Sequence, residues 1–376
     1  MLALVLVVSP ARADVTTERG ASVLVFPKVF FDSASTVALQ SRGPVDTIIQ
    51  ISNTSNSIAF ARCLYVNAAP VDPTRPASIT NPPQWQETDF EIFLTRQQPT
   101  HWLVSTGRLT DASDNRPCAS GCNGAGFDPG LIPPVADPFE GELKCIEVDS
   151  SGAPISGNHL KGEVTIVSQL TGDVSKYNAI GILGLNDSNN SDDTLCLGGG
   201  SSQACPTGAE YNACPESLVF SHFSENATDP VAQELGNGPL HVITELTLVP
   251  CTEDFENQVA TQLNVQFAIT NEFEEQFSTS IPVTCWANLP LNSIFPIFDV
   301  SVLGTRFAQT RITSPDTDVT GNVQSGVLGV AEEFHQSGTE RNGLCTGAPC
   351  SRAAFNLHTE GERPNGDVIV LPGVLF

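Results

Sequence analysis

Cysteine is the residue type whose chemistry and spacing say most about this chain, which contains 11 of them in 376 residues. In an oxidising compartment cysteines pair as disulfides by default, and a bridge that closes a long loop stabilises a fold most. Zinc binding is the alternative, but the short-range cysteine spacings lack the neighbouring histidines of zinc sites. The candidate bridges are Cys63–Cys145, Cys251–Cys285, Cys118–Cys122 and Cys345–Cys350, with one further pair drawn from Cys196, Cys205 and Cys214.

A second group of residues has the spacing of a calcium loop. Oxygen-bearing side chains occupy every second position at Asp187, Asn189, Ser191 and Asp193. Calcium is bound by such alternating oxygen ligands, but the familiar loop has a glycine at its sixth position and a glutamate at its twelfth. Here these positions are Asp192 and Gly198. Calcium is therefore the one cofactor that the sequence suggests, and a solvated loop without metal is the alternative.

Catalytic motifs are not evident. The six histidines are scattered, and the sequence contains neither H-E-x-x-H nor G-x-S-x-G. No catalytic residue is assigned. An acid/base site assembled from separate loops remains possible from one sequence, so a secreted hydrolase stays open as the alternative function.

Aromatic residues suggest one candidate ligand patch. Trp85 lies near the Pro-rich stretch 69–83, and His101 and Trp102 follow a short strand predicted at residues 90–94. Exposed aromatic rings would suit a glycan or polymer ligand. The alternative is that both indoles cover the open end of a β-sandwich.

The charge of the chain excludes some partners. Its formal net charge is −25, from 17 basic and 42 acidic side chains. Such a surface repels phosphate, so we expect no nucleic-acid partner and no docking to anionic lipid. The acidity either keeps the protein soluble or attracts a divalent cation or a basic partner.

The N-terminus reads as an export signal. Residues 2–8 are apolar, and the small-x-small triplet Ala11-Arg12-Ala13 follows them. This pattern predicts a signal peptide at residues 1–13 and export to the periplasm, the cell surface or the extracellular space. No apolar run reaches the length of about 20 residues that a transmembrane helix needs.

Alternating apolar residues indicate an all-β chain. Residues 46–67 and 263–288 each look like two strands joined by a polar turn, and residues 141–148 and 160–167 look like a third hairpin. The strand predicted at 21–31 contains Pro27, which favours an edge position or a bulge. The repetition of the hairpin pattern predicts two tandem antiparallel β-sandwich (Ig-like) domains at residues 20–185 and 241–376, with a loop-rich insertion at 186–240.

The runs SVLVFP, TIIQISNTSNSIAFARCLYVN and GELKCIEVDSSGAPISGNHLKGEVTIV also carry a resemblance. They look like uncharacterised exported bacterial proteins with tandem Ig-like or sandwich-type β domains. The resemblance implies an exported protein and no particular activity. The repeated β pattern, the acidity and the absence of catalytic motifs lead us to expect a non-enzymatic structural or binding (adhesion-type) protein whose partner is a glycan, a polymer or another protein.

Overall fold

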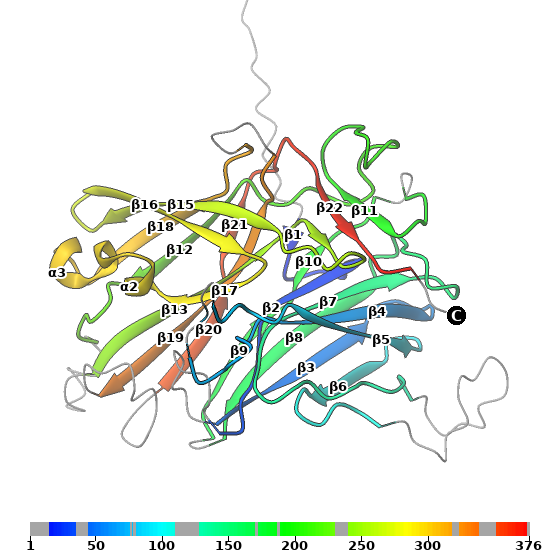
Figure 1. Ribbon diagram of the computed structural model, residues 1–376, viewed down its shortest axis with the longest axis horizontal. Helices are drawn as coiled ribbons and strands as arrows, with labels where there is room; N and C mark the ends of the chain where they lie inside the picture. The colour runs from blue at the N-terminus through cyan, green and yellow to red at the C-terminus, as the bar shows by residue number, and fades with distance from the viewer. Residues whose placement is uncertain are drawn as a thin grey trace, which may run out of the picture.

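The computed structural model describes residues 15–34, 44–75, 77, 80–109, 128–169, 172–185, 189–229, 240–317, 323–337 and 351–373. Several predictions fall outside these residues: the signal peptide at 1–13, the bridges Cys118–Cys122 and Cys345–Cys350, and the calcium ligand Asp187. The described residues form five sheets, and helix is confined to three short turns (Figure 1).

Two sheets come from the N-terminal half of the chain. The larger has, in spatial order, β1 (Val15–Thr16), β10 (Ile180–Ile182), β2 (Val23–Phe31), β7 (Phe139–Val148), β4 (Ala59–Asn67) and β5 (Gln86–Leu94). The smaller has β6 (Pro99–Leu103), β3 (Val45–Asn53), β8 (Leu160–Ser168) and β9 (Val174–Asn178).

The other three sheets contain the C-terminal half. One has β16 (Gln276–Thr284), β15 (Gln262–Asn271), β18 (Phe307–Thr313), β12 (Ser217–Phe223) and β21 (His358–Glu360). A second has β17 (Ala287–Pro290), β13 (Leu240–Pro250), β19 (Val327–Ser337) and β20 (Ser351–Asn356). The smallest has β11 (Thr194–Leu197), β22 (Asp367–Val370) and β14 (Glu253–Asp254). The short helices α2 (Leu291–Ile294), η1 (Pro296–Phe298) and α3 (Val300–Leu303) follow β17.

The prediction of two tandem Ig-like sandwiches is wrong. The five small sheets are arranged in the manner of a five-bladed β-propeller. Each sheet gathers strands from distant parts of the chain; β11, β22 and β14, for example, come from three separate regions. The alternation of apolar residues identifies strands, but it does not say which strands pair, and that choice separates the two architectures.

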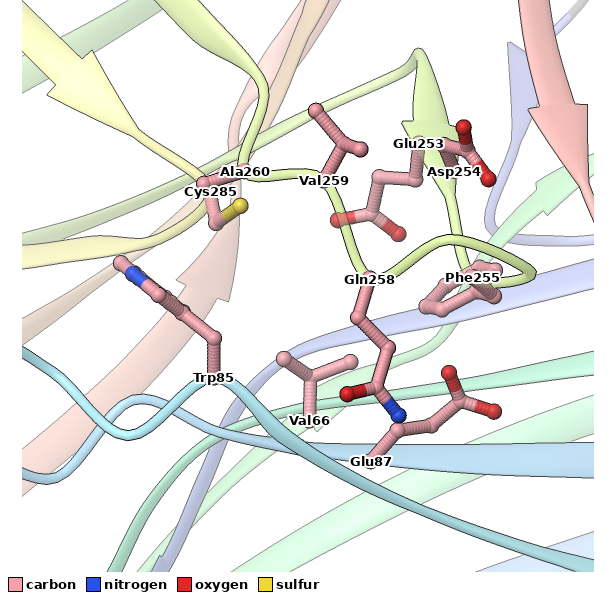
Figure 2. Close-up of a pocket in the computed structure, with 10 residues that line it drawn as sticks. All are labelled: Val66, Trp85, Glu87, Glu253, Asp254, Phe255, Gln258, Val259, Ala260 and Cys285. Atoms are coloured by element: carbon pink, nitrogen blue, oxygen red, sulfur yellow. The ribbon is translucent and has the colours of Figure 1, made fainter.

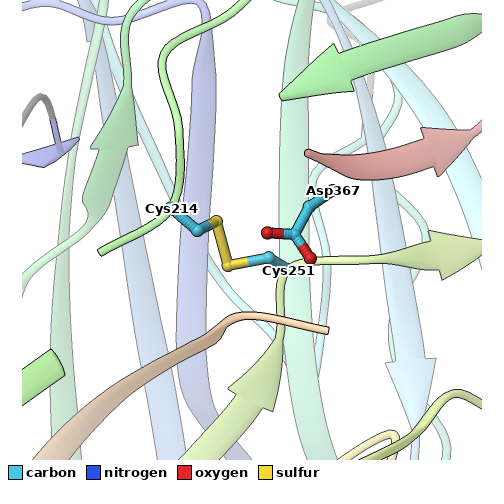
Figure 3. Close-up of side chains that lie close together, drawn as sticks. All are labelled: Cys214, Cys251 and Asp367. Atoms are coloured by element: carbon cyan, nitrogen blue, oxygen red, sulfur yellow. A yellow bond between two sulfur atoms is a disulfide. The ribbon is translucent and has the colours of Figure 1, made fainter. Parts of the chain in front are cut away.

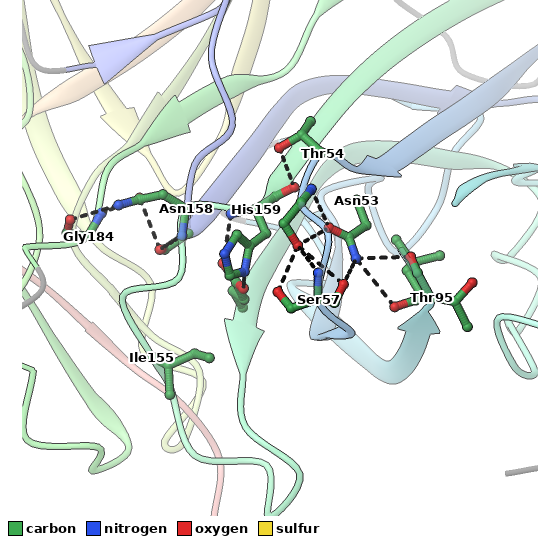
Figure 4. Close-up of polar contacts among 12 residues, drawn as sticks. Asn53, Thr54, Ser57, Thr95, Ile155, Asn158, His159 and Gly184 are labelled. Carbon is green, nitrogen blue, oxygen red and sulfur yellow. Dashed lines mark hydrogen bonds and ion pairs between the residues drawn. The ribbon is translucent and has the colours of Figure 1, made fainter. Parts of the chain in front are cut away.

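The predicted hairpin at 46–67 does not form. β3 pairs with β6 and β8, whereas β4 pairs with β5 and β7, so the chain passes from one sheet to another between them. Asn53 fixes this passage, since its side-chain amide donates to the carbonyls of Ser57 at 2.7 Å and Thr95 at 3.0 Å (Figure 4). The pair at 141–148 and 160–167 is likewise split between β7 and β8, which lie in different sheets.

The hairpin at 263–288, by contrast, is present as β15 and β16, which pair over their whole lengths. Asn271 closes its turn, because its side-chain oxygen accepts from the backbone N–H groups of Phe273 and Glu275, both at 2.9 Å. Asn53 and Asn271 therefore both organise turns, but only the turn at Asn271 joins neighbouring strands.

The two halves of the chain share one core. The larger hydrophobic cluster contains residues of β2, β4 and β7 together with Val249, Trp286 and Leu371 from the C-terminal half. The Trp286 indole N–H donates to the Pro27 carbonyl at 2.8 Å, and its ring contacts Phe30 edge-on. Packing across the halves therefore holds the sheets in place.

Pro27 produces the bulge that its position in a predicted strand favoured. The register between β2 and β7 shifts between Phe26 and Val29, which turns the Lys28 side chain toward the C-terminal half. Its ammonium lies 3.1 Å from Glu245 on β13 and 2.9 Å from Glu332 on β19, and all three side chains are buried. A bulge is a common device for re-aiming one side chain.

No helix in the described part of the chain has the length and apolar character needed to cross a membrane.

Replacing Lys28 by Ala should destabilise the fold by about 3–5 kcal/mol, because Glu245 and Glu332 would stay buried without the Lys28 ammonium, and Arg352, 3.5 Å from Glu332, would be the cation beside that carboxylate. Lys176→Ala is the control, since the Lys176–Glu163 pair is half exposed and should contribute less than about 1 kcal/mol. Urea midpoints of both variants measure the difference. Equal midpoints would show that the buried pairs do not hold the halves together.

Candidate functional site

The candidate functional site is a groove between β5 and the loop that follows β14 (Figure 2). It consists of two adjoining hollows that share Glu87, Phe255 and Gln258. The inner hollow, of about 30 Å³, has room for about two water molecules. The outer hollow, of about 460 Å³, is large enough for part of a ligand. The residues that line the two hollows are Arg62, Val66, Trp85, Glu87, Asp89, Phe90, Glu91, Glu253, Asp254, Phe255, Glu256, Gln258, Val259, Ala260, Cys285, Pro372 and Gly373.

Strand pairing positions the loop that forms one wall. β14 pairs in parallel with β22, and a bridge between Asp254 and Val259 closes the loop on itself. The Phe255 N–H donates to the Val370 carbonyl at 2.9 Å. Gln258 then points from the loop toward the strand that carries Glu87 (Figure 2).

Glu87 lines both hollows of the groove and has a pKa shifted toward neutral pH. Burial, helped by repulsion from Asp89, raises its pKa to about 7, and Arg62 opposes the rise. One of its carboxylate oxygens is buried and has no hydrogen-bond partner among the described residues. Glu87 thus changes charge near neutral pH.

Arg62 is already engaged at the far side of the outer hollow. Its guanidinium contacts the Asp89 carboxylate at 3.2 Å and donates to the Pro372 carbonyl at 2.6 Å. The Arg62 charge is therefore offset mainly by Asp89. Glu87, Glu91 and Glu256 therefore leave the groove strongly negative.

A buried carboxylate cluster lies beneath the inner hollow. The Lys144 ammonium contacts Glu142 at 2.8 Å and also contacts Glu253. Burial and the neighbouring Glu142 carboxylate raise the pKa of Glu253 well above its usual range, although Lys144 opposes the rise. Two carboxylates that share one ammonium favour the retention of a proton on one of them.

Cys285 is the free cysteine of the described residues, and it lines the inner hollow. Burial and the nearby Glu253 raise the pKa of its thiol to about 12. Because the thiolate is the nucleophile, a thiol with this pKa is unreactive at neutral pH.

Three disulfides occur among the described residues: Cys63–Cys145, Cys196–Cys205 and Cys214–Cys251. The first is the long-range pair that the sequence favoured. The predicted pair Cys251–Cys285 is wrong, because Cys251 bonds Cys214 across the expected insertion boundary. Of the three cysteines in the insertion, Cys196 pairs with Cys205 and Cys214 pairs with Cys251, so none is left over.

The Cys214–Cys251 bridge lies beside Asp367 in an arrangement that resembles a metal site (Figure 3). The two sulfurs are bonded to each other, so neither can ligate as a thiolate. The Asp367 carboxylate accepts from Thr252 and from the backbone of Gly326, both at 2.8 Å. This cluster is structural.

Among the predicted calcium ligands, the Asn189 side chain is engaged in hydrogen bonds within the protein. The Asn189 side-chain oxygen accepts from the Ser191 backbone N–H at 2.7 Å, and its amide group donates to the Tyr211 hydroxyl at 2.9 Å. The backbone carbonyl of Asp193 accepts from Leu371. Hydrogen bonds within the protein thus account for the Asn189 side chain, and calcium binding here stays a prediction.

The predicted aromatic patch of Trp85, His101 and Trp102 is not formed. Trp102 is 2% exposed and its indole donates to the Tyr65 hydroxyl at 2.6 Å, whereas its neighbour His101 is exposed. Alternation along β6 points these neighbours to opposite faces. Trp85 is partly buried and lines the inner hollow of the groove.

The groove itself was missed in the sequence. Its signal is the alternation Glu87-x-Asp89-x-Glu91 along a strand that was predicted only from residue 90 onward. The facing loop gives no comparable signal in the sequence. Its position depends on the pairing of β14 with β22, two strands that are far apart in the chain.

Comparisons with known proteins give no family. No protein-family model matches the chain, and no curated protein matches it. A structure titled Thermotoga maritima 1070 matches 43% of this chain and 93% of its own, with 9% identity and a TM-score of 0.23. Cowpea mosaic virus top component, an empty particle, matches 98% of both chains with 9% identity and a TM-score of 0.15. At these scores neither likeness supports an inference.

Cys285 should resist iodoacetamide at pH 8 in the folded protein and react once the protein is unfolded in urea, because it is buried and its thiol is protonated. Mass spectrometry of the unreduced digest should find Cys214 linked to Cys251. A peptide that links Cys251 to Cys285 would contradict this pairing.

Glu87→Gln should alter how stability depends on pH. The folded-state pKa of Glu87 is raised, so its contribution is fully present below the unfolded pKa of about 4.5 and is lost as pH rises through 7. Because Glu87 is partly exposed, solvent screening reduces the effect to about 1 kcal/mol.

Urea midpoints at pH 5 and pH 8 test this expectation. The wild-type protein should lose more stability between these pH values than Glu87→Gln does. Glu272→Gln in the exposed β15–β16 turn controls for the loss of one negative charge. Identical pH dependence in the wild type and Glu87→Gln would contradict the assignment.

Proposed function

We propose that this protein is an exported, non-enzymatic binding or structural protein that acts at the cell surface or in the extracellular space. The observation that carries the proposal is the groove, which combines a trough of about 460 Å³ with a row of carboxylates. Partners are commonly bound on such open surfaces, whereas small substrates are usually enclosed.

The sulfur chemistry supports export. Three disulfides among the described residues, two of them between residues 37 or more positions apart, are typical of proteins that fold in oxidising compartments. The apolar run and small-x-small triplet at residues 2–13 agree with a secreted chain.

The groups with catalytic chemistry are poorly placed for it. The Cys285 thiol is buried and protonated, and the Glu253 carboxyl lies under a hollow that admits only water. His222 is fully buried, and burial lowers its pKa to about 4. A general acid or base must reach the substrate proton.

Glu87 favours the alternative of a secreted hydrolase. A carboxyl group with a pKa of about 7 is suited to general acid catalysis, and Asp89 lines the same hollow. The hydrolase alternative therefore predicts that turnover depends on Glu87.

A panel of chromogenic glycosides, esters and peptides at pH 5, 6, 7 and 8 tests the proposal. We expect no hydrolysis above the buffer blank, because the Cys285 thiol, the Glu253 carboxyl and the His222 ring are buried and cannot reach a substrate. Hydrolysis that Glu87→Gln abolishes and Glu272→Gln preserves would overturn the non-enzymatic proposal in favour of the hydrolase.

A further inference from the structure

The free edge of β5 is the starting observation. β5 ends its sheet and pairs only with β4, from Gln86 to Leu94. On its outer side, the segment 128–130 lies against the end of the strand, where the Phe93 N–H donates to the Pro129 carbonyl at 2.9 Å and Gly130 lies beside the Glu91 carbonyl. Within the part of the chain that the structure describes, the backbone from Gln86 to Phe90 has no strand on that side. An unpaired edge is a template for another strand.

The side chains along this edge are charged in a regular pattern. Glu87, Asp89 and Glu91 alternate with Thr88 and Phe90, so the three carboxylates lie on one face of the strand. Successive carboxylates are about 7 Å apart at the rise of an extended strand. All three line the outer hollow, which Glu256 faces from the opposite loop.

We propose that this groove binds an extended cationic peptide segment, which adds a strand to the free edge of β5 and places a Lys or Arg side chain at every second position against Glu87, Asp89 and Glu91. The inference rests on the proposed binding function and names the partner class of the same groove. Strand addition supplies backbone hydrogen bonds, and alternate side chains supply specificity.

Charge and shape both favour this partner. The described groups that face Glu87 are Asp89, Glu91, Arg62 and, from the loop, Glu253, Asp254 and Glu256. Arg62 is held by Asp89 and Pro372, so the carboxylates outnumber the available cations. The partly buried Trp85 offers apolar contact to the stems of long cationic side chains, and the buried Phe255 lines the same hollow.

Binding of this kind is linked to a proton. Because the pKa of Glu87 is about 7, a cation that settles beside it favours the ionised form and releases a proton. The affinity should therefore rise by up to about tenfold between pH 6 and pH 8, the range in which Glu87 becomes ionised.

The test uses a capped heptapeptide with Lys at positions 1, 3, 5 and 7 and Val between them, titrated by calorimetry into the full-length protein. We expect saturable 1:1 binding, stronger at pH 8 than at pH 6, with heats that depend on the ionisation enthalpy of the buffer. Glu87→Gln/Glu91→Gln should weaken binding by about five- to tenfold. This double variant keeps the Asp89–Arg62 contact.

Glu272→Gln/Glu274→Gln is the matched control, because it removes two exposed charges far along the chain from β5. It should bind the peptide as the wild type does. Equal weakening by both double variants would mean attraction to the overall charge of −25 and would overturn the proposal.

Two further peptides test the geometry. An isomer with its four lysines clustered, and a version methylated on the backbone nitrogens of both the lysines and the valines, keep the charge but lose the spacing or the backbone donors. Both should bind at least fivefold more weakly, and unchanged affinity would overturn strand addition. Absence of all peptide binding also overturns the inference, whereas the proposed function fails separately, on Glu87-dependent turnover in the substrate panel.

Discussion

The buried ammonium of Lys28 is the interaction on which the arrangement of the sheets depends. It sits between Glu245 and Glu332, with the Asn288 side-chain oxygen at 3.2 Å. A charge buried without partners is very costly, so β2 can keep Lys28 inside only if β13 and β19 lie against it. Hydrophobic contacts alone would tolerate several relative positions of the sheets. The ion cluster is compatible with few relative positions of the sheets, because moving either carboxylate away from Lys28 leaves a buried charge without one of its partners.

Pro27 and its neighbours explain why Lys28 points inward at all. A proline cannot donate to a ladder, and the bulge that it creates leaves the backbone groups around it in need of partners. The Tyr177 hydroxyl donates to the Lys28 carbonyl at 2.8 Å and accepts from the Lys28 N–H at 3.0 Å, while Trp286 donates to the Pro27 carbonyl. One irregular dipeptide thus recruits groups from both halves of the chain.

This dipeptide also shows how far the sequence could predict the fold. Pro27 predicts the bulge in β2, and the alternation of apolar residues predicts the strands. Cys63 and Cys145 are also predicted to pair, and they lie opposite each other on two strands that pair directly. Pairing between distant strands was beyond reach, because the pattern of β3 and β4 is the same whether they form a hairpin or enter different sheets. The error at Cys251 has the same origin, since its partner Cys214 was assigned to an insertion and not to the shared core.

The groove combines a local feature with a long-range one. The row Glu87, Asp89 and Glu91 is visible in the sequence, but its meaning depends on β5 being the last strand of its sheet. Natural edges are protected by charge against chance pairing, and a row of carboxylates would serve that purpose alone. Protection does not require the loop of β14 to face the row, nor a buried oxygen on Glu87 that lacks a partner. A carboxylate held half out of water costs stability, and a fold retains such a cost more readily where a cation comes to offset it. The same carboxylates that repel acidic strands would then select a basic one.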